Sequence, residues 1–455
     1  LRGLLVLSLC GAPGLVRNAE GLLRGSRRLL GAGLWGALLR ATFYGHFVGG
    51  CSPGEVQASA GRLRALGLRP MLALPSEQPV GEEWYAANQA AALELVALAG
   101  SCGPHPMMQL KVTSLLSARL CEVLSEHVVQ AGREQALDWL EAALGGEVLG
   151  HAPSRITLSK RPQNPRILAP IQPKSAGAQN RHLGVGLRRL DDVSKAAASA
   201  GVKLLVDAEL SPISPALDLV TLALIGRHNR GAEPWIWNTY QAYRKDCAPR
   251  LWGDVGLALR RGSRCGLKLV RGAYLEQERA WARARGVQDP LQPSLEHTHR
   301  SYSECLELAL GLVAAGDLQL MVATHNEASV LEATQRSAVG VAGSPAPGAK
   351  WLPVGSIGSF GGGARMQRLG VARSGGGVCF GQLLGMCDHV SLALGAAGYA
   401  VYKSVPVGAP CRTLPYLARR AQENRGVLGG SREPLLLLRE LRRRCWGALG
   451  GSKTS

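Results

Sequence analysis

Short apolar segments alternate with longer amphipathic segments along most of this chain. The apolar segments lie near residues 71, 108, 203, 235, 266, 319, 378 and 400, and most of them precede a stretch with apolar residues at helical spacing. Strands that alternate with helices are typical of a parallel sheet. Eight such units predict an α/β fold, a (β/α)8 barrel of the TIM type, whose ligand-binding side chains lie at the carboxyl ends of the strands.

Polar residues occur on or directly after several of the predicted strands. They are Lys111, Asp207, Gln241, Lys268, Arg271, Thr324 and His325. Lys111 lies near the middle of the predicted strand Met108–Leu115, where its charge needs a solvated face or an anionic partner. Because the carboxyl ends of barrel strands surround one opening, we expect these polar residues to form one site.

The segment Gly266–Glu278 is the centre of this predicted site. Lys268 and Arg271 lie on its strand, and the small residues Gly272 and Ala273 follow. Cations at the end of a strand, next to backbone that a ligand can approach closely, suit an anionic cofactor. The alternative is a buried strand whose end charges are merely solvated.

The helix predicted over Thr413–Leu428 carries a second cluster of polar side chains. Tyr416, Arg419, Arg420 and Glu423 are spaced so that they share one face of that helix. Two neighbouring arginines suit the two oxygens of a carboxylate, while the glutamate holds the pair in place and the tyrosine provides an aromatic wall. The alternative is an ordinary surface cluster of charges.

Composition narrows the possible partners. With 52 Lys and Arg against 33 Asp and Glu, the net charge of +19 permits nucleic acid, anionic lipid or an anionic ligand. Aromatic residues make up only 5% and the arginines are scattered or gathered at the two ends, so we predict no nucleic-acid partner. The 11 cysteines include no C-x-x-C pair, which is typical of reduced thiols, and we predict no metal site.

The pattern also suggests boundaries along the chain. Residues 1–54 are rich in Arg and contain one acid, which is typical of a mitochondrial transit segment; the alternative is a basic helix that stays on the mature protein. A G-x-G-x-x-G pattern at Gly31, Gly33 and Gly36 follows no predicted strand, so we reject a dinucleotide-binding interpretation. The main domain spans 55–430, with irregular insertions at 146–180 and 337–377, and a basic tail covers 431–455.

Eight motifs in this order resemble the proline dehydrogenase family: MQLKVT, LLVDAE, WNTYQAY, KLVRGAYLEQERA, MVATHNE, CFGQLLGMCDH, VYKSVP and LPYLARRAQEN. They cover roughly residues 54–145 and 180–430. The resemblance implies a distorted (β/α)8 barrel that follows an N-terminal helical region and holds FAD noncovalently. It also implies hydride transfer from the substrate to flavin N5 and electron transfer to ubiquinone, with peripheral contact at the matrix side of the inner mitochondrial membrane.

The resemblance assigns roles to individual residues. Asp207 and Lys268 are similar to the family's active-site acid and flavin-side cation, and Lys111, Arg419 and Arg420 to its ligands for the substrate carboxylate. We place Tyr416, Ser404 and Glu423 with the substrate. The positions that match flavin-contacting residues are Val206, Gln241, Arg271, Gly272, Ala273, Tyr274, Thr324 and His325.

Ser404 departs from the family pattern. Members that prefer proline usually carry Tyr at this place in a Tyr-x-Pro pattern, whereas this chain has Ser404-Val405-Pro406. A small side chain with a hydroxyl leaves room for a 4-hydroxyl on the substrate ring. We therefore predict oxidation of trans-4-hydroxy-L-proline to 3-hydroxy-1-pyrroline-5-carboxylate. The alternatives are an L-proline dehydrogenase that gives 1-pyrroline-5-carboxylate, and a non-catalytic barrel whose chemistry was lost through the insertions.

Overall fold

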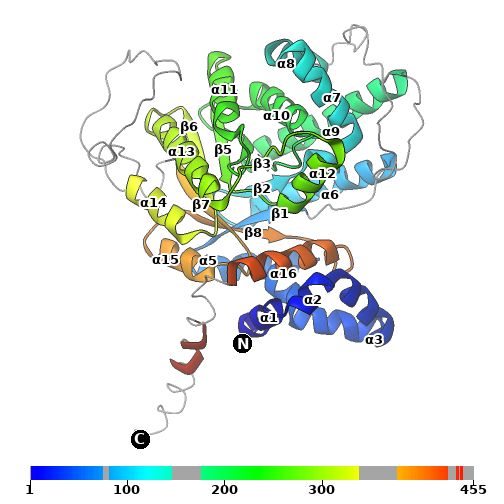
Figure 1. Ribbon diagram of the computed structural model, residues 1–455, viewed down its shortest axis with the longest axis vertical. Coiled ribbons are helices and arrows are strands. Elements are labelled where there is room, and N and C mark those ends of the chain that lie inside the picture. The colour runs from blue at the N-terminus through cyan, green and yellow to red at the C-terminus, as the bar shows by residue number, and fades with distance from the viewer. Residues whose placement is uncertain are drawn as a thin grey trace, which may run out of the picture.

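Eight parallel strands close a barrel in the computed structural model of the protein, which describes residues 2–74, 81–145, 176–337, 377–428, 437–439 and 441–443 (Figure 1). Each strand pairs with its neighbours in sequence, and the eighth pairs with the first. The eight predicted strands and the barrel are thereby confirmed. The strands are β1 (Arg69–Ala73), β2 (Met107–Leu110), β3 (Lys203–Val206), β4 (Ile236–Gln241), β5 (Cys265–Val270), β6 (Leu318–Ala323), β7 (Val378–Leu383) and β8 (Val401–Pro406).

Alternation along the strands separates two apolar cores. Residues such as Leu267 and Leu269 of β5 point outward into the large core between barrel and helices, while Lys268 between them faces the interior. A smaller cluster, which includes Met107, Trp237, Met321 and Tyr402, fills the amino-terminal part of the interior. The polar inward positions therefore lie above an apolar floor, near the carboxyl ends of the strands.

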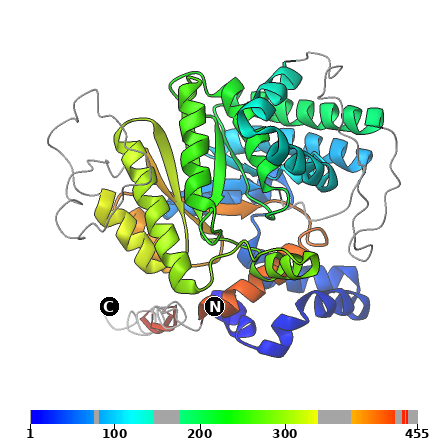
Figure 2. The same ribbon diagram turned by 45° about the horizontal axis from the view of Figure 1, so that its top comes forward.

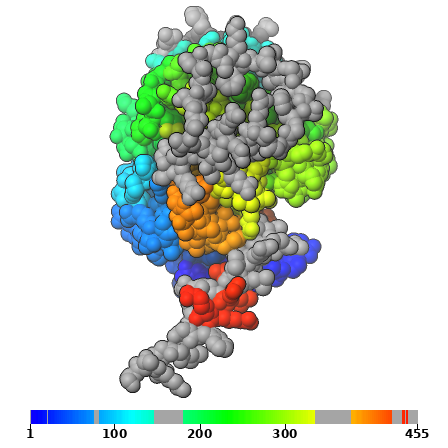
Figure 3. Space-filling model, turned by 90° about the vertical axis from the view of Figure 1, so that its left-hand side faces the viewer, coloured from blue at the N-terminus to red at the C-terminus, as the bar shows by residue number. Residues whose placement is uncertain are grey.

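Helices surround the barrel and supply the outer core. They are α5 (Pro53–Ala65), α6 (Glu82–Ser101), α7 (Ala118–Ala131), α8 (Arg133–Leu144), α9 (Ala176–Ser199), α10 (Ser214–His228), α11 (Cys247–Arg260), α12 (Leu275–Arg285), α13 (Leu295–Ala314), α14 (Glu327–Ser337), α15 (Asp388–Ala396) and α16 (Leu414–Leu428). On the face shown in Figure 3, α14 in yellow lies beside α15 in orange, and His389 of α15 is 2.8 Å from Glu327 of α14.

The N-terminal region forms four helices that pack on α16: α1 (Arg2–Cys10), α2 (Pro13–Arg17), α3 (Ala19–Ala41) and α4 (Phe43–Phe47) (Figures 1 and 2). Phe47 and Trp35 join Leu417 of α16 in a third buried cluster. The Tyr44 hydroxyl donates to the Gly408 carbonyl at 2.8 Å, which ties α4 to the loop after β8. The prediction that residues 1–54 are a transit segment stays a prediction, and the packing favours its alternative.

Two sequence-based boundaries differ from the structure. The strand predicted over Met108–Leu115 ends at Leu110, and a 3-10 helix, Val112–Ser114, follows. Lys111 therefore lies at the carboxyl end of β2 instead of in the middle of a strand, at the rim of the barrel. The irregular stretch predicted to end at residue 180 ends earlier, because α9 begins at Ala176. Most of the predicted insertions at 146–180 and 337–377 and of the tail lies outside the described residues.

Candidate active site

A cavity of about 840 Å³ opens at the carboxyl ends of the strands. Its size lies within the usual range of small-molecule and cofactor sites, roughly 300–1,000 Å³. Every predicted site residue except Val206 lines it. Val206 belongs to the outer core because strand alternation turns it away from its neighbour Asp207, and its carbonyl accepts a hydrogen bond from Thr239 Oγ1 at 2.7 Å.

Asp207 and Lys268 form an ion pair at the bottom of the cavity. Lys268 is 4% exposed, and its Nζ donates to Asp207 Oδ1. The backbone N–H of Asp207 donates to the Leu110 carbonyl at 2.9 Å, which fixes the position of the acid just beyond β3. A buried ammonium group is costly without an opposite charge, so Asp207 is what allows Lys268 to face the barrel interior.

A glutamine extends this pair toward the last strand. Nε2 of Gln109, on β2, donates to Asp207 Oδ1 at 3.3 Å. Oε1 of the same side chain accepts from the Ser404 hydroxyl at 2.5 Å. The sequence reasoning missed Gln109. The available signal was its place two residues before Lys111, because residues two apart on a strand share a face. Thr239, two residues before Gln241, is a second cavity residue that the same rule identifies.

Lys111 meets an anion of the protein itself. Burial raises the pKa of Glu209, and the positive charge of Lys111 opposes that shift. Thr113 also stabilises the carboxylate, through hydrogen bonds of 2.5 Å from its hydroxyl and 3.2 Å from its backbone N–H. The Glu209 carbonyl accepts from Gln241 Nε2 at 2.8 Å, so this cluster joins the ends of three neighbouring strands.

The predicted face of α16 points into the cavity. Arg420 Nη2 donates to Glu423 Oε1 at 2.6 Å, and the guanidinium lies 4.9 Å from the centre of the Tyr416 ring. Arg419 lies 5.7 Å from the centre of the Tyr274 ring across the cavity mouth. Within the described parts of the chain, Arg420 Nε is buried and has no hydrogen-bond partner. The two arginines carry two positive charges, whereas the acid beside them, Glu423, carries one negative charge. This face can therefore accept a carboxylate.

The cation at the end of β5 is held firmly. Arg271 contacts His299 Nδ1 at 2.7 Å and Ser329 Oγ at 2.6 Å, and it stacks at 5.0 Å from the Tyr302 ring centre. Burial lowers the pKa of Arg271. Its Nε is buried without a hydrogen-bond partner in the portion of the chain that the structure describes. A buried guanidinium with an unsatisfied N–H is a natural binding group for an anion.

The backbone after Arg271 has a conformation that requires glycine. Gly272 has φ +141°, and a Cβ there would lie 2.3 Å from the Tyr243 ring. The backbone can thus run close to the cavity between Arg271 and Tyr274. The orphaned Arg271 Nε and this bare backbone fit an anionic cofactor such as FAD.

His325 is a neutral hydrogen-bonding group. Burial lowers its pKa to about 3, and the positive charges of Lys403 and Arg420 add to the effect. Its Nε2 accepts from the Leu383 backbone N–H at 3.1 Å, which leaves the hydrogen on Nδ1. Neighbouring Thr324 Oγ1 accepts from the Asn326 N–H at 3.1 Å and so orients the loop after β6.

Comparison with known proteins agrees with this geometry. The sequence model of the family described as proline dehydrogenase matches residues 83–341 and 363–433. Hydroxyproline dehydrogenase of Bos taurus is 45% identical over 98% of this chain and 90% of its own length, and that of Xenopus laevis is 41% identical over 97% and 86%. Proline dehydrogenase 1, mitochondrial, of Homo sapiens is 31% identical over 97% and 86%.

Solved structures show the same fold. Proline utilization A from Bdellovibrio bacteriovorus has a TM-score of 0.59 at 16% identity, over 86% of this chain. A variant of the Bradyrhizobium japonicum protein gives 0.56 at 19% identity, over 88%. This chain spans about a third of each of those longer proteins. On the family match and the sequence identities, the chain belongs to the proline dehydrogenase family.

Proposed function

We propose that the protein is an FAD-dependent dehydrogenase that oxidises trans-4-hydroxy-L-proline to 3-hydroxy-1-pyrroline-5-carboxylate. The observation that carries this proposal is the meeting, in one cavity, of the Asp207–Lys268 pair, whose lysine is buried, and the arginine face of α16. The first group suits the reacting end of an amino acid, and the second suits its carboxylate. The names of the relatives with 41–45% identity support the same substrate.

Binding the carboxylate is the proposed role of Arg419, Arg420 and Lys111. Guanidinium groups can each donate two parallel hydrogen bonds, which fixes the orientation of the substrate as well as its affinity. Glu423 and Tyr416 hold Arg420 in place from the same helix. Correct orientation of the ring carbon next to the nitrogen is the main contribution of such a clamp to the rate.

FAD is the proposed cofactor, and when bound it would supply the acceptor for the hydride that leaves the ring carbon. The residues that would hold it are Arg271 and Lys268 as cations, Gly272 and Ala273 as closely approachable backbone, and Gln241, Tyr274, Thr324 and His325 as further lining groups. Lys268 keeps a positive charge at the barrel interior, where it favours negative charge that develops during the reaction.

Ser404 favours the hydroxylated substrate over proline. Ser404 lines the cavity and is 5% exposed as a residue, so an added hydroxyl on the substrate ring can find a partner there. L-Proline dehydrogenase activity is the second candidate, and the 31% identity to proline dehydrogenase 1 of Homo sapiens favours it. The two substrates differ by one hydroxyl group, so their relative turnover decides between these candidates.

We place the protein in mitochondria, with ubiquinone as electron acceptor and peripheral contact with the inner membrane. The name of the human relative, proline dehydrogenase 1, mitochondrial, supports the location. Exposed leucines on α3, among them Leu29 at 87% and Leu34 at 63%, lie near the exposed arginines Arg27 and Arg28. An apolar surface flanked by cations suits an anionic membrane. None of the helices in the described segments is both long and apolar enough to span a bilayer.

Product analysis tests the proposed reaction. The protein, supplied with FAD and a soluble quinone, is incubated with trans-4-hydroxy-L-proline, and the mixture is analysed by mass spectrometry. We expect a product that has lost two hydrogen atoms and that does not form in the Arg419→Met/Arg420→Met double variant. Failure of the flavin-loaded protein to convert either hydroxyproline or proline would leave the non-catalytic barrel as the better account.

A further inference from the structure

A continuous set of polar contacts crosses the cavity floor from β8 to β5. The Ser404 hydroxyl donates to Gln109 Oε1 at 2.5 Å, Gln109 Nε2 donates to Asp207 Oδ1 at 3.3 Å, and Asp207 pairs with Lys268. Among the described residues, Gln109 is the one that connects the serine to the charged pair through hydrogen bonds. We propose that Gln109 is a specificity-determining residue, which orients the Ser404 hydroxyl to accept a hydrogen bond from the 4-hydroxyl of the substrate ring.

The charged pair determines which way the Gln109 amide faces. An ionised carboxylate has only acceptor atoms, and Asp207 forms an ion pair with the Lys268 ammonium group. Gln109 must therefore turn its NH₂ toward Asp207, which leaves its carbonyl oxygen facing Ser404. The orientation of a glutamine amide follows from its hydrogen-bond partners, and here the partner is a fixed charge.

The amide in turn determines the direction of the serine hydrogen. A hydroxyl group has one hydrogen and two lone pairs. Because the hydrogen of Ser404 is committed to Gln109 Oε1, Ser404 Oγ presents only lone pairs to a ligand in the cavity. A substrate hydroxyl can donate to those lone pairs, whereas a ring CH₂ group cannot. Lys268, Asp207 and Gln109 together thus make the serine an acceptor.

The strand register explains why a glutamine is needed for this contact. Ser404 lies on β8 and Gln109 on β2, and β1 runs between them, with Met71 opposite Ser404 and Ala73 opposite Gln109. Ser404 and Gln109 are therefore not neighbours on adjacent strands. A long side chain is required to reach across β1, and Ala73 is small enough to leave the passage open.

This inference rests on the proposed function, and it predicts a distinctive response to a substrate analogue. The fluorine of trans-4-fluoro-L-proline is close to a hydroxyl group in size but cannot donate a hydrogen bond. If Ser404 is only an acceptor, we expect the KM of the wild-type enzyme for the fluoro compound to exceed that for trans-4-hydroxy-L-proline by at least about tenfold. Equal KM values would overturn the proposal, because they would mean that Ser404 donates or that only the size of the ring substituent matters.

The Gln109→Leu variant tests the same point from the protein side. Leucine keeps the approximate size but releases the Ser404 hydrogen, so we expect the gap in KM between the hydroxy and fluoro substrates to close to within about threefold. In a Ser404→Ala background, Gln109→Leu is expected to have no further effect on the ratio of the two KM values, because the two residues act through one contact.

The outcomes separate this inference from the function on which it rests. A wild-type enzyme that oxidises neither proline nor hydroxyproline contradicts the proposed function, and this inference with it. A wild-type enzyme that oxidises hydroxyproline efficiently, but whose preference over the fluoro compound survives Gln109→Leu, contradicts this inference alone. If Gln109→Leu does not fold, the comparison of the two substrates with the wild-type enzyme still decides.

Discussion

At the scale of single residues, the geometry of a charged group matters as much as its charge. Arg420 donates to Glu423 with one nitrogen and lies over the Tyr416 ring, while its Nε is buried without a hydrogen-bond partner among the described residues. A lysine carries the same charge but is a point-like donor that cannot do all three at once. The arrangement is therefore specific to arginine.

We expect Arg420→Lys to raise the KM for trans-4-hydroxy-L-proline by about tenfold to a hundredfold, because it loses a charge-assisted contact worth roughly 1.5–3 kcal/mol. Steady-state kinetics at saturating quinone measure this change. Arg412→Lys is the matched control, since Arg412 is exposed and lies outside the cavity near the start of the same helix. A KM for Arg420→Lys equal to that of the control would remove Arg420 from the carboxylate site.

Most individual site residues can be predicted from the sequence because they are polar residues on a predicted strand or directly after one. Lys268, Asp207 and His325 come directly from that rule, and the structure brings them into one cavity. Gln109 was missed because it is uncharged and lies before the end of its strand, so only its spacing from Lys111 points to it. His299 was missed because it lies on α13, and only the tertiary fold brings it to Arg271.

At the scale of elements, α16 has two different faces. One carries the arginines toward the cavity, and the other packs Leu417 and Ala421 against α1–α4. The position of Arg419 and Arg420 thus depends on helices far away in the sequence. Apolar periodicity along the chain does not reveal contacts between distant segments. From the sequence, the N-terminal region could therefore be interpreted only by its composition, which is similar to that of a transit segment.

Phe47 connects these helices to α16 and is fully buried. We expect Phe47→Ala to lower the free energy of unfolding by about 3–5 kcal/mol, the usual cost of the cavity left by a buried phenylalanine. Urea denaturation measures the loss, and Phe43→Ala, at a partly buried neighbour, is expected to cost clearly less. Equal stability of the wild-type and Phe47→Ala proteins would show that α4 does not pack on the folded enzyme.

The exposed leucines of α3 should make its surface bind membranes. We expect the Leu29→Glu/Leu34→Glu double variant to bind vesicles that contain anionic lipid about tenfold or more weakly than the wild type, because it removes two apolar contacts with the lipid and adds negative charge. Vesicle co-sedimentation measures the binding. Leu331→Glu on α14 is the control, because Leu331 is exposed as well, at 57%. Unchanged binding by the double variant would place the membrane contact elsewhere.

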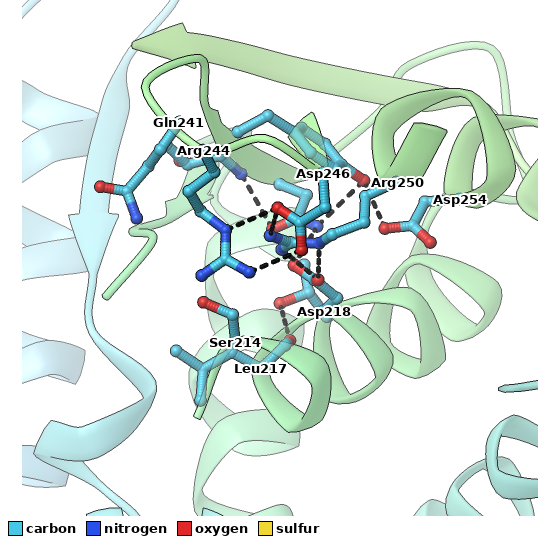
Figure 4. A network of polar contacts seen from close by, with 12 residues as sticks. Ser214, Leu217, Asp218, Gln241, Arg244, Asp246, Arg250 and Asp254 are labelled. Carbon is cyan, nitrogen blue, oxygen red and sulfur yellow. Dashed lines mark hydrogen bonds and ion pairs between the residues drawn. The ribbon is translucent and has the colours of Figure 1, made fainter. Parts of the chain in front are cut away.

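At the scale of the whole molecule, a buried polar network ties the barrel to its outer helices (Figure 4). Asp218 of α10 pairs with Arg250 of α11, and Tyr240 of β4 donates to Asp254 Oδ2 at 2.9 Å. Burial and the nearby charge of Asp218 raise the pKa of Asp254 to about 7, although Arg133 opposes the shift. The folded protein therefore holds this proton at pH values where the unfolded chain has released it.

A raised carboxyl pKa makes a contribution to stability that is present at low pH and is lost as the pH rises through the folded value. We expect the free energy of unfolding of the wild type, relative to Asp254→Asn, to fall by on the order of 1–2 kcal/mol between pH 5.5 and pH 7.5. Urea denaturation at the two pH values measures the difference. No change in that difference would contradict the raised pKa, and Asp138→Asn at an exposed ion pair serves as the control.

The barrel strands could be predicted more completely from the sequence than the helices that surround them. Apolar strands are short and distinct, so all eight were found. Helix α10 was missed because it is buried on nearly all faces, and an apolar pattern all round the helix removes the period of 3.6 residues on which a prediction depends. Helices α8, α11 and α14 were missed as well, and nothing in the structure explains that.

The central claim is that the protein oxidises the hydroxylated ring of trans-4-hydroxy-L-proline. Rapid mixing in the absence of oxygen tests this claim most directly. The flavin-loaded protein is mixed with trans-4-hydroxy-L-proline or L-proline, and the loss of flavin absorbance is followed in time. We predict bleaching by both, with a second-order rate constant at least about tenfold higher for the hydroxylated substrate. Faster bleaching by L-proline would contradict the role of Ser404, and no bleaching by either would contradict the proposed reaction.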